Sequence, residues 1–294
     1  INPAAGRGRA AAIGVETASA LEETGLRIVD VSGADALEAF EQGQQAAAAD
    51  LDALVIVGGD GTVNLGVNAV AGLDVPLGIV PAGSGNDTAR SLGLPMRVRA
   101  AIANVIEALD REPMVIDAGT VVHEGRPGIR WFASVLVGGL DAAVNMRANN
   151  LAVSGSLAYL AAVALTVPRF RPYGWRVVLD DVVWDEPGTL VSVANTTMIG
   201  GGMRVAPNAD PTDGLFDVVI AEGVTPFEVL RVFPRLYSGT HLSHRKVHVF
   251  RSATVSLEPT DSGVPPPLTC ADGEIIAPWP VRLRCHKAAL RILA

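Results

Sequence analysis

The stretch that most constrains this chain is an apolar run at residues 54–57 followed at once by Gly-Gly-Asp-Gly-Thr, after which apolar residues recur at helical spacing. This order predicts a buried strand, a tight turn and the start of a helix. The glycines of the turn leave no side chain between backbone N–H groups and a bound oxyanion. A helix N-terminus at Thr62 attracts the same phosphate. Asp60 would repel that phosphate unless a cation lies between them, so the turn predicts a nucleotide bound with Mg²⁺.

Composition sets the broad class of the protein. The chain has 294 residues, of which 49% are hydrophobic, and this is enough for two domains with their own cores. The net charge of −8 argues against nucleic-acid binding, which needs a basic face. The longest strongly apolar segment, 157–167, is shorter than the roughly 20 residues that span a bilayer. Cys270 and Cys285 provide no disulfide framework, and we expect a cytoplasmic protein.

Strands and helices alternate over the first third of the chain. The apolar pattern predicts strands at 27–31, 54–57 and 76–80, and helices at 10–21, 35–49 and 98–109. A second polar, glycine-rich turn at 81–87 follows the third of these strands. Such alternation predicts a parallel, doubly wound sheet that binds ligands at the carboxyl ends of its strands. We therefore expect both glycine-rich turns at one binding edge, in an α/β domain spanning residues 1–117.

The second part of the chain has a different rhythm. From about residue 115, segments are short, rich in β-branched residues and separated by turn residues. Two helical segments, 157–167 and 226–237, interrupt them. This pattern predicts a mainly antiparallel β-sandwich over residues 118–288.

One motif supports a rival hypothesis. Gly6, Gly8 and Ala11 fit the dinucleotide-binding pattern G-x-G-x-x-A, and Asp30 ends a predicted strand, where it would bind a ribose hydroxyl. This pattern leaves open a dinucleotide-binding oxidoreductase.

A histidine triplet raises a second alternative. His241, His244 and His248 have the spacing H-x₂-H-x₃-H, which would suit zinc if the three side chains shared one face. The segment is expected to change from loop to strand, however, so a basic surface patch is the favoured interpretation.

Four motifs together resemble the diacylglycerol kinase catalytic family, especially its bacterial lipid kinases. They are Asn2-Pro3 with Gly6, the turn at 58–64, the turn at 81–87, and Ala271-Asp272-Gly273-Glu274. The resemblance covers essentially the whole chain. It implies an α/β domain similar to that of NAD kinases and phosphofructokinases, followed by a β-sandwich domain for the lipid substrate, with the active site between them. It also implies that residues 289–294 return to the first domain.

The resemblance assigns ATP contacts to residues at the carboxyl ends of the first strands. These are Asn2, Pro3, Gly6, Ser32, Gly58, Gly59, Asp60, Gly61, Thr62, Val63, Asn64 and Ser84. Ser84 stands where relatives more often have threonine and keeps the hydroxyl. The sequence around Ser84 also resembles the sphingosine-kinase and ceramide-kinase branch, which leaves the lipid acceptor open.

The resemblance also assigns catalytic roles to three carboxylates. Asp-Gly is a common hairpin turn in its own right, but relatives keep Asp272-Gly273-Glu274 as an acid–base element. We expect Glu274 to accept the proton and Asp272 to be its close partner, although the sequence does not separate the two. Asp60 completes the catalytic set through Mg²⁺, because phosphoryl transfer depends mostly on positioning and charge neutralisation.

A third group of carboxylates lies in the turn at 208–215. Asp210, Asp213 and the backbone carbonyl of Leu215 have the oxygen ligands that a hard cation takes from a tight loop. The group resembles the family's second, structural magnesium site. By the same analogy, Asp117 is expected to join a charge network with Asp60 and Arg7.

These patterns favour an ATP- and Mg²⁺-dependent kinase that converts diacylglycerol to phosphatidic acid. A kinase for sphingoid or other lipids and an NAD-kinase-like enzyme remain alternatives. The expected partners are ATP and a membrane lipid reached by transient membrane contact, with no nucleic acid, and a homodimer is left open. The expected location is the cytoplasm, with peripheral membrane association.

Overall fold

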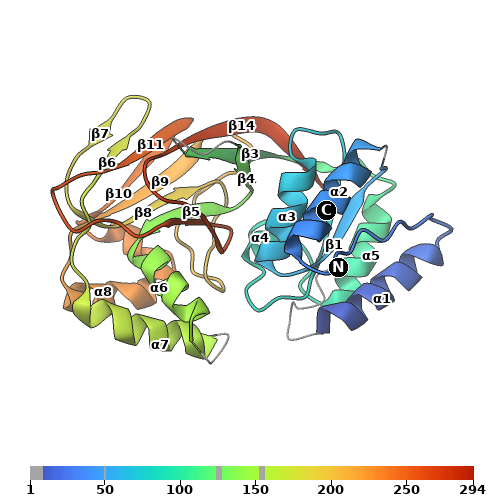
Figure 1. Ribbon diagram of the computed structural model, residues 1–294, viewed down its shortest axis with the longest axis horizontal. Helices are drawn as coiled ribbons and strands as arrows, with labels where there is room; N and C mark the ends of the chain where they lie inside the picture. The colour runs from blue at the N-terminus through green and yellow to red at the C-terminus, as the bar shows by residue number, and fades with distance from the viewer. Residues whose placement is uncertain (1–8, 50, 124–127, 152–155) are drawn as a thin grey trace.

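The computed structural model describes residues 9–49, 51–123, 128–151 and 156–294. The N-terminal half is an α/β unit in which β1 and β2 pair in parallel, between helices (Figure 1). Its elements are α1 (Arg9–Glu22), α2 (Ala36–Ala48), β1 (Leu54–Gly58), α3 (Asp60–Val70), β2 (Leu77–Pro81), α4 (Asp87–Ser91) and α5 (Val98–Ala108). The predicted helices and the two strands that end in glycine-rich turns are therefore present.

The strand predicted at 27–31 is wrong. Residues 26–33 form no ladder with any strand in the described part of the chain. The segment is apolar in sequence, but Val29 is largely exposed, and a strand without a pairing partner leaves its backbone groups to solvent.

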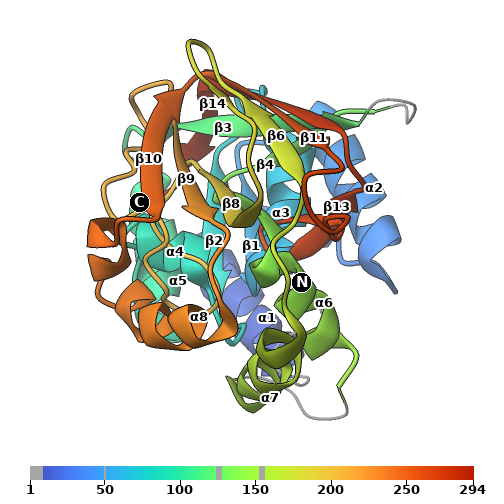
Figure 2. The ribbon, with the colours of Figure 1, turned by 90° about the vertical axis from the view of Figure 1, so that its left-hand side faces the viewer.

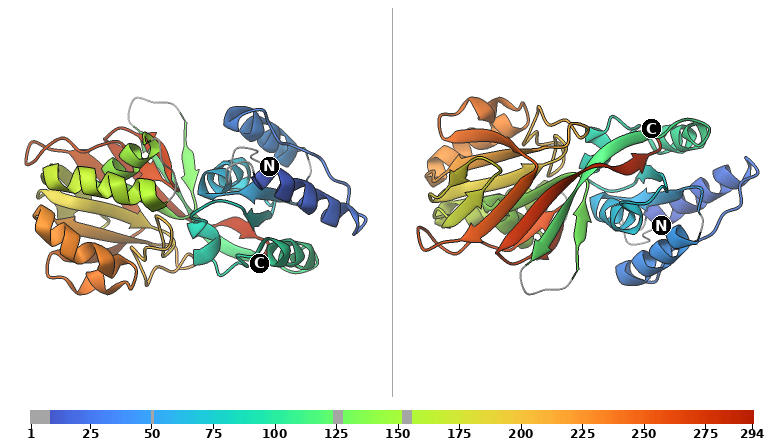
Figure 3. Two further views of the ribbon diagram at one scale, coloured as in Figure 1. Left: turned by 90° about the horizontal axis from the view of Figure 1, so that it is seen from below. Right: turned by 90° about the horizontal axis from the view of Figure 1, so that it is seen from above.

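Two long strands join the halves of the molecule. β3 (Met114–His123) pairs antiparallel with β14 (Val281–Ile292), and Figure 3 shows both crossing from one half to the other. At the end of β14, Ile292 pairs in parallel with Leu77 of β2, and the N–H of Leu293 donates to the Leu77 carbonyl over 3.0 Å. One mixed, eight-stranded sheet thus extends through the molecule in the order β1-β2-β14-β11-β6-β7, with β3 also pairing with β14 and β4 pairing with β3.

A second, wholly antiparallel sheet packs on the C-terminal part of the first. Its order is β10-β9-β8-β5-β12-β13. A shared core that includes Phe132, Trp175 and Phe216 fills the space between the sheets. The strands of this half are β4 (Arg130–Phe132), β5 (Val135–Gly139), β6 (Trp175–Val178), β7 (Val183–Trp184), β8 (Gly188–Ala194), β9 (Phe216–Glu222), β10 (Val247–Ser252), β11 (Thr254–Pro259), β12 (Thr269–Ala271) and β13 (Glu274–Ala277).

Helices cover the other face of the second sheet (Figure 2). They are α6 (Leu140–Asn149), α7 (Ser156–Thr166), α8 (Pro226–Val232) and the 3₁₀ turns η2 (Val167–Arg169), η3 (Phe233–Leu236) and η4 (Thr240–Ser243). Among the described helices, none is long and apolar enough to cross a membrane. The predicted fold class, an α/β domain followed by a mainly antiparallel sandwich, is confirmed. The domain boundaries stay a prediction, because β3 and β14 contribute to both halves.

Candidate active site

The two glycine-rich turns lie against each other at the carboxyl ends of β1 and β2. A Cβ atom on Gly59 would lie 3.0 Å from the Gly83 Cα, and one on Gly83 would collide with Gly59. The Ala82 N–H donates to the Gly58 carbonyl over 2.8 Å. Asn86, at φ 54°, closes the second turn by exchanging hydrogen bonds with the backbone of Gly83. Only glycine allows this approach of one backbone to the other.

Helix α3 points its N-terminus into the same place. Gly59 is the N-cap and supplies no side chain to cap the helix. The first N–H groups of α3 are therefore available to an anion, which the positive end of the helix dipole favours. Asp60 opens the helix, and its Oδ1 accepts the Thr88 N–H at 3.2 Å. The geometry is that of a phosphate cradle with one carboxylate set inside it.

A carboxylate of α4 reaches the C-terminal half. Asp87 is buried and accepts the N–H groups of Gly201 and Gly202, each at 2.7 Å. Burial raises the pKa of Asp87, with a further contribution from the Asp60 charge, although the two N–H donors oppose the shift. The sequence interpretation missed this contact between the halves. Three consecutive glycines, at 200–202, were the available signal.

The Asp272-Gly273 turn brings Glu274 to the cradle. Both turn residues have positive φ, 50° and 84°, which matches a two-residue hairpin between β12 and β13. The hairpin directs the Glu274 side chain at α3, so that a Cβ atom added to Gly61 would lie 2.5 Å from Glu274 Oε1. Glu274 is exposed. The predicted acid–base residue and the predicted donor loop are thus adjacent, although they are far apart in the sequence.

Asp272 is held in a different way. Its carboxylate is buried and accepts four N–H groups at 3.0–3.2 Å, from Ala133, Ser134, Val135 and the Asn64 side chain. Burial and the nearby Asp60 charge raise its pKa to about 6, against the effect of these donors. With its lone pairs occupied, Asp272 is suited to fixing the hairpin and Asn64, and Glu274 is the carboxylate free to meet a substrate.

A second asparagine strengthens the contact between α3 and the C-terminal half. Asn68 lies one helical turn after Asn64 and contacts it through its Nδ2. It also exchanges hydrogen bonds of 2.8 Å with the backbone of Trp131. Sequence reasoning missed Asn68, and its only signal was the i, i+4 spacing from Asn64.

Four carboxylates concentrate negative charge around the phosphate cradle. Asp60 acts electrostatically on both Asp87 and Asp272, which raises the pKa of each. Glu274 adds a fourth carboxylate beside Gly61. Hard cations such as Mg²⁺ take carboxylate oxygens as ligands. Asp60 lies in the phosphate cradle, and Mg²⁺ binding by Asp60 stays a prediction.

Replacing Gly61 by alanine should lower the rate of the reaction by up to about 10²-fold. The new methyl group would push away the Glu274 carboxylate, and small misplacements of a catalytic group have effects of this size. Steady-state kinetics measures kcat. Gly66→Ala, later in the same helix, also adds a methyl group, but the nearest side chains to that methyl group would be Ile56 and Leu77 of the core. An equal loss of kcat in the two variants would contradict the assigned contact.

The buried Asp272 should make stability fall as pH rises from about 4 to about 6. Its folded pKa of about 6 lies above an unfolded value near 3.9, so the folded state binds more protons over this range. The stabilisation is present below about pH 4 and is lost through pH 6, by about 3 kcal/mol. Urea unfolding at several pH values measures it. Asp272→Asn should lack this slope, and parallel curves for parent and variant would contradict the shift.

The remaining predicted nucleotide residues are placed as follows. Ser84 is exposed on the second turn, and Val63 is buried in the core. Ser32 adjoins Val31 and Gly33, which with Thr62 line a cavity of about 370 Å³. Small-ligand pockets commonly measure about 300–1,000 Å³. Asn2, Pro3 and Gly6 lie outside the described residues, as does Arg7.

The predicted structural magnesium site is occupied by other contacts. Asp210 Oδ1 accepts the backbone and hydroxyl groups of Thr212, at 3.0 and 2.7 Å. Asp213 accepts the Leu215 N–H at 2.9 Å and pairs with the Arg251 guanidinium. Metal binding by Asp210, Asp213 and Leu215 stays a prediction, and a cation there would have to displace Arg251 from Asp213.

Asp117 has a structural set of partners. It accepts the N–H groups of Gly214 and Ala288, at 2.6 and 2.9 Å. Asn195, which sequence reasoning did not single out, donates to the Asp117 carbonyl at 2.9 Å. Asp117 therefore fixes the junction of the halves, and no hydrogen bond joins it to Asp60 within the described residues.

The three histidines have separate environments. His241 is buried, with Nε2 3.0 Å from the Val205 carbonyl, whereas His248 Nε2 lies 2.8 Å from Glu222. His244 Nδ1 accepts the Lys246 N–H. The described part of the chain contains no group of three or more His, Cys, Asp or Glu side chains that could hold a metal ion.

Comparisons with known proteins agree with this geometry. Residues 1–121 match the family model described as "Diacylglycerol kinase catalytic domain". Residues 134–294 match the model described as "YegS C-terminal NAD kinase beta sandwich-like domain". A diacylglycerol kinase of Mycobacterium tuberculosis (strain H37Rv) is 36% identical over 297 residues, covering 99% of this chain and 93% of the relative. The chain belongs to the diacylglycerol kinase family. The family prediction is therefore confirmed.

One further relative and two solved structures are also similar to this chain. A diacylglycerol kinase of Bacillus subtilis (strain 168) is 29% identical, covering 71% of this chain and 68% of the relative. A solved diacylglycerol kinase of Bacillus anthracis (strain Sterne) has a TM-score of 0.62 at 16% identity, covering 89% and 82%. A second structure from that strain has a TM-score of 0.76 at 21% identity, covering 99% and 94%. These structures support the fold alone.

Family membership weighs against the oxidoreductase alternative. Gly6 and Gly8 lie outside the described residues, and Ala11 lies within α1. Asp30 Oδ1 accepts the Ser32 N–H at 2.9 Å in a segment that is not a strand. The strand that a ribose-binding carboxylate should follow is therefore missing at Asp30.

Proposed function

We propose that this chain is an ATP-dependent lipid kinase that phosphorylates diacylglycerol to phosphatidic acid. The observation that carries the proposal is the position of Glu274, whose carboxylate lies against Gly61 in the phosphate cradle. A phosphate donor on the cradle and a lipid hydroxyl at Glu274 would then meet at one point. The 36% identical relative named a diacylglycerol kinase supports this acceptor.

The donor side is built from backbone. ATP would place its phosphates on the N-terminus of α3 and the turn that contains Ser84, with its nucleoside towards the cavity beside Thr62. Asp60 would hold Mg²⁺ there. Bound Mg²⁺ neutralises charge on the transferring phosphoryl group.

The acceptor side depends on Glu274. Its carboxylate would accept the hydroxyl proton while the lipid oxygen forms a bond to the γ-phosphorus. The bond from that phosphorus to the bridging oxygen breaks, and ADP leaves with the electron pair. Positioned general bases contribute about 10²–10⁴-fold to such reactions. Asp272 would keep the hairpin and Asn64 in place during the reaction.

An apolar cavity offers room for part of an acyl chain. It measures about 110 Å³ and lies between the second sheet and helices α6–α8. Its lining is almost wholly apolar and includes Val144, Val163 and Val229. Apolar cavities of about 150 Å³ stay dry and take up apolar molecules. Asp141 borders the cavity on α6, the helix that directly follows β5, and β5 pairs with β12 of the hairpin that leads to Glu274.

A lipid panel assay tests the function. Purified protein with γ-labelled ATP and Mg²⁺ should transfer label to diacylglycerol in mixed micelles. Sphingosine, ceramide, monoacylglycerol and NAD are the competing acceptors. Preferential labelling of one of these would reassign the acceptor, and no labelling of any lipid would refute the proposal.

We further propose that the enzyme works in the cytoplasm at a membrane surface. Analytical ultracentrifugation would decide whether it forms a homodimer.

A further inference from the structure

Helices α7 and α8 combine buried and exposed apolar side chains. Their inner sides line the cavity, through residues such as Val163 and Val229. Both helices nevertheless expose large apolar side chains: Leu160 and Leu165 of α7, at 56% and 41%, and Phe227 and Leu230 of α8, at 74% and 55%. A surface helix of a globular protein normally turns a polar face outward. Such a concentration of exposed large apolar side chains marks an interaction surface.

These side chains belong to one face of the molecule. α7, the η2 turn that follows it and α8 share one core cluster, which includes Val163, Val167 and Val229. The left panel of Figure 3 shows both helices side by side on the underside of the C-terminal half, and Figure 2 places both at its lower end. Phe227 and Leu230 share one side of α8, because they are three positions apart. We call the surface formed by Leu160, Leu165, Phe227 and Leu230 the helical face.

The charge around the helical face is opposite in sign to that of the whole chain. Segments 156–171 and 224–246 contain a single acidic residue, Glu228, in a protein whose net charge is −8. Their basic residues are Arg169, Arg171, Arg231, Arg235, Arg245 and Lys246. Basic residues thus predominate in the segments that carry the exposed apolar side chains.

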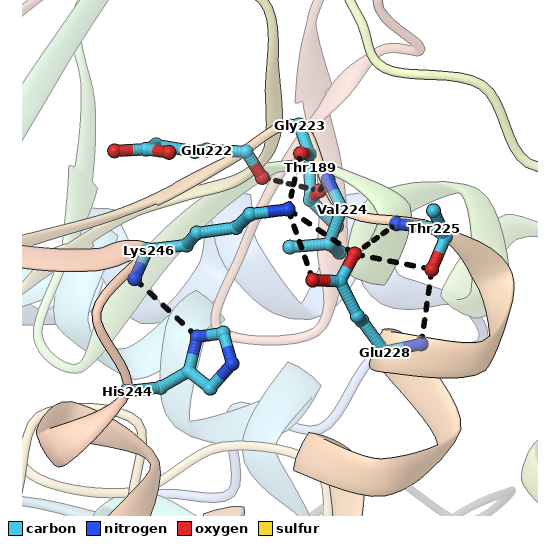
Figure 4. A network of polar contacts seen from close by, with 8 residues as sticks. All are labelled: Thr189, Glu222, Gly223, Val224, Thr225, Glu228, His244 and Lys246. Atoms are coloured by element: carbon cyan, nitrogen blue, oxygen red, sulfur yellow. Dashed lines mark hydrogen bonds and ion pairs between the residues drawn. The ribbon is translucent and has the colours of Figure 1, made fainter.

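The single acidic residue is already neutralised. Glu228 accepts both the Lys246 ammonium, at 3.0 and 3.1 Å, and the Thr225 N–H, at 2.8 Å (Figure 4). The hydrogen bond from the Thr225 N–H has the largest effect on the Glu228 pKa, and the Lys246 ammonium the next largest. Together they lower this pKa to about 2. Glu228 therefore stays ionised and engaged in its own capping box, and it leaves the positive charge of the arginines undiminished.

We propose that the helical face docks on an anionic lipid bilayer. A helix with apolar side chains beside a basic face lies in the membrane interface, and basic side chains attract anionic headgroups. The inner side of the same helices lines the apolar cavity, so a lipid would pass from the bilayer between α7 and α8 towards Glu274. This proposal rests on the proposed function for the lipid substrate, but bilayer binding is measurable without catalysis.

Vesicle flotation with the full chain tests the docking. The protein should float with vesicles of phosphatidylcholine and phosphatidylglycerol, but weakly with phosphatidylcholine alone, and added salt should weaken binding. The double variant Phe227→Ser, Leu230→Ser should lose at least about 10-fold in vesicle affinity, since both side chains would otherwise enter the bilayer. Leu37→Ser on α2, at an equally exposed leucine in the N-terminal half (65%), is the matched control and should bind as the parent does.

The outcomes separate the docking from the catalytic proposal. Unchanged vesicle binding by the double variant would overturn the docking surface. The docking surface would also be overturned if the parent were a dimer in ultracentrifugation without vesicles and the double variant alone were not. The helical face would then bind a second copy of the chain. A chain that floats normally but phosphorylates no lipid would refute the proposed function and leave the docking surface intact. Circular dichroism verifies that the double variant is folded.

Discussion

Replacing Glu274 by glutamine should lower kcat for phosphoryl transfer about 10²–10⁴-fold, because the amide cannot accept the proton of the lipid hydroxyl. The side chain keeps its size, so its contact with Gly61 is retained. Glu274 is exposed and forms no part of the core, and the free energy of unfolding should change by less than about 0.5 kcal/mol. Transfer of labelled phosphate measures kcat, and calorimetric titration should give an unchanged Kd for ATP.

A matched substitution separates this effect from a general loss of negative charge. Glu258→Gln changes a half-buried glutamate on β11, in the other sheet, and should leave kcat as in the parent. If the Glu274→Gln variant had the kcat of the parent, another group would have to accept the proton of the lipid hydroxyl. Asp272 would be the next candidate, although its oxygens already accept four N–H groups.

The local parts of the fold could be predicted because local sequence determines them. Helices α2 and α5 follow apolar spacing, and Asp35 caps α2 as expected for that residue type. The strand at 27–31 could not be judged in this way, because a strand depends on a partner elsewhere in the chain. The continuous sheet could not be predicted for the same reason, because the local sequence does not indicate the pairing of Met114 with Ile292.

The same distinction between local and distant contacts applies to the candidate site. Both glycine-rich turns and the Asp272-Gly273 hairpin could be predicted, because close backbone approach and positive φ need particular residues. The partners that join the halves could not, since Asp87 meets Gly201 only after the sandwich has formed. The sequence favoured Glu274 as the proton acceptor but could not separate it from Asp272. Their burial separates them and supports Glu274 as the proton acceptor.

Replacing Asp60 by asparagine should lower kcat/KM about 10²–10³-fold, the size expected for loss of one group that stabilises transition-state charge. The dependence of rate on Mg²⁺ should also move to higher concentration, because a carboxylate ligand is lost. The fold should survive, since the asparagine Oδ1 can still accept the Thr88 N–H. Steady-state kinetics over a Mg²⁺ series measures both effects.

Stability gives an independent readout of the same substitution. In metal-free buffer, Asp60→Asn should be at least as stable as the parent, because it removes the charge that raises the pKa values of Asp87 and Asp272. Added Mg²⁺ should raise the Tm of the parent but not of the variant, since a ligand stabilises only a fold that binds it. Asp52→Asn, at an exposed aspartate just before β1, is the control and should retain the Mg²⁺ response. If Asp60→Asn responded to Mg²⁺ as the parent does, the cation would be held by other residues, and Asp60 would act only through its contact with Thr88.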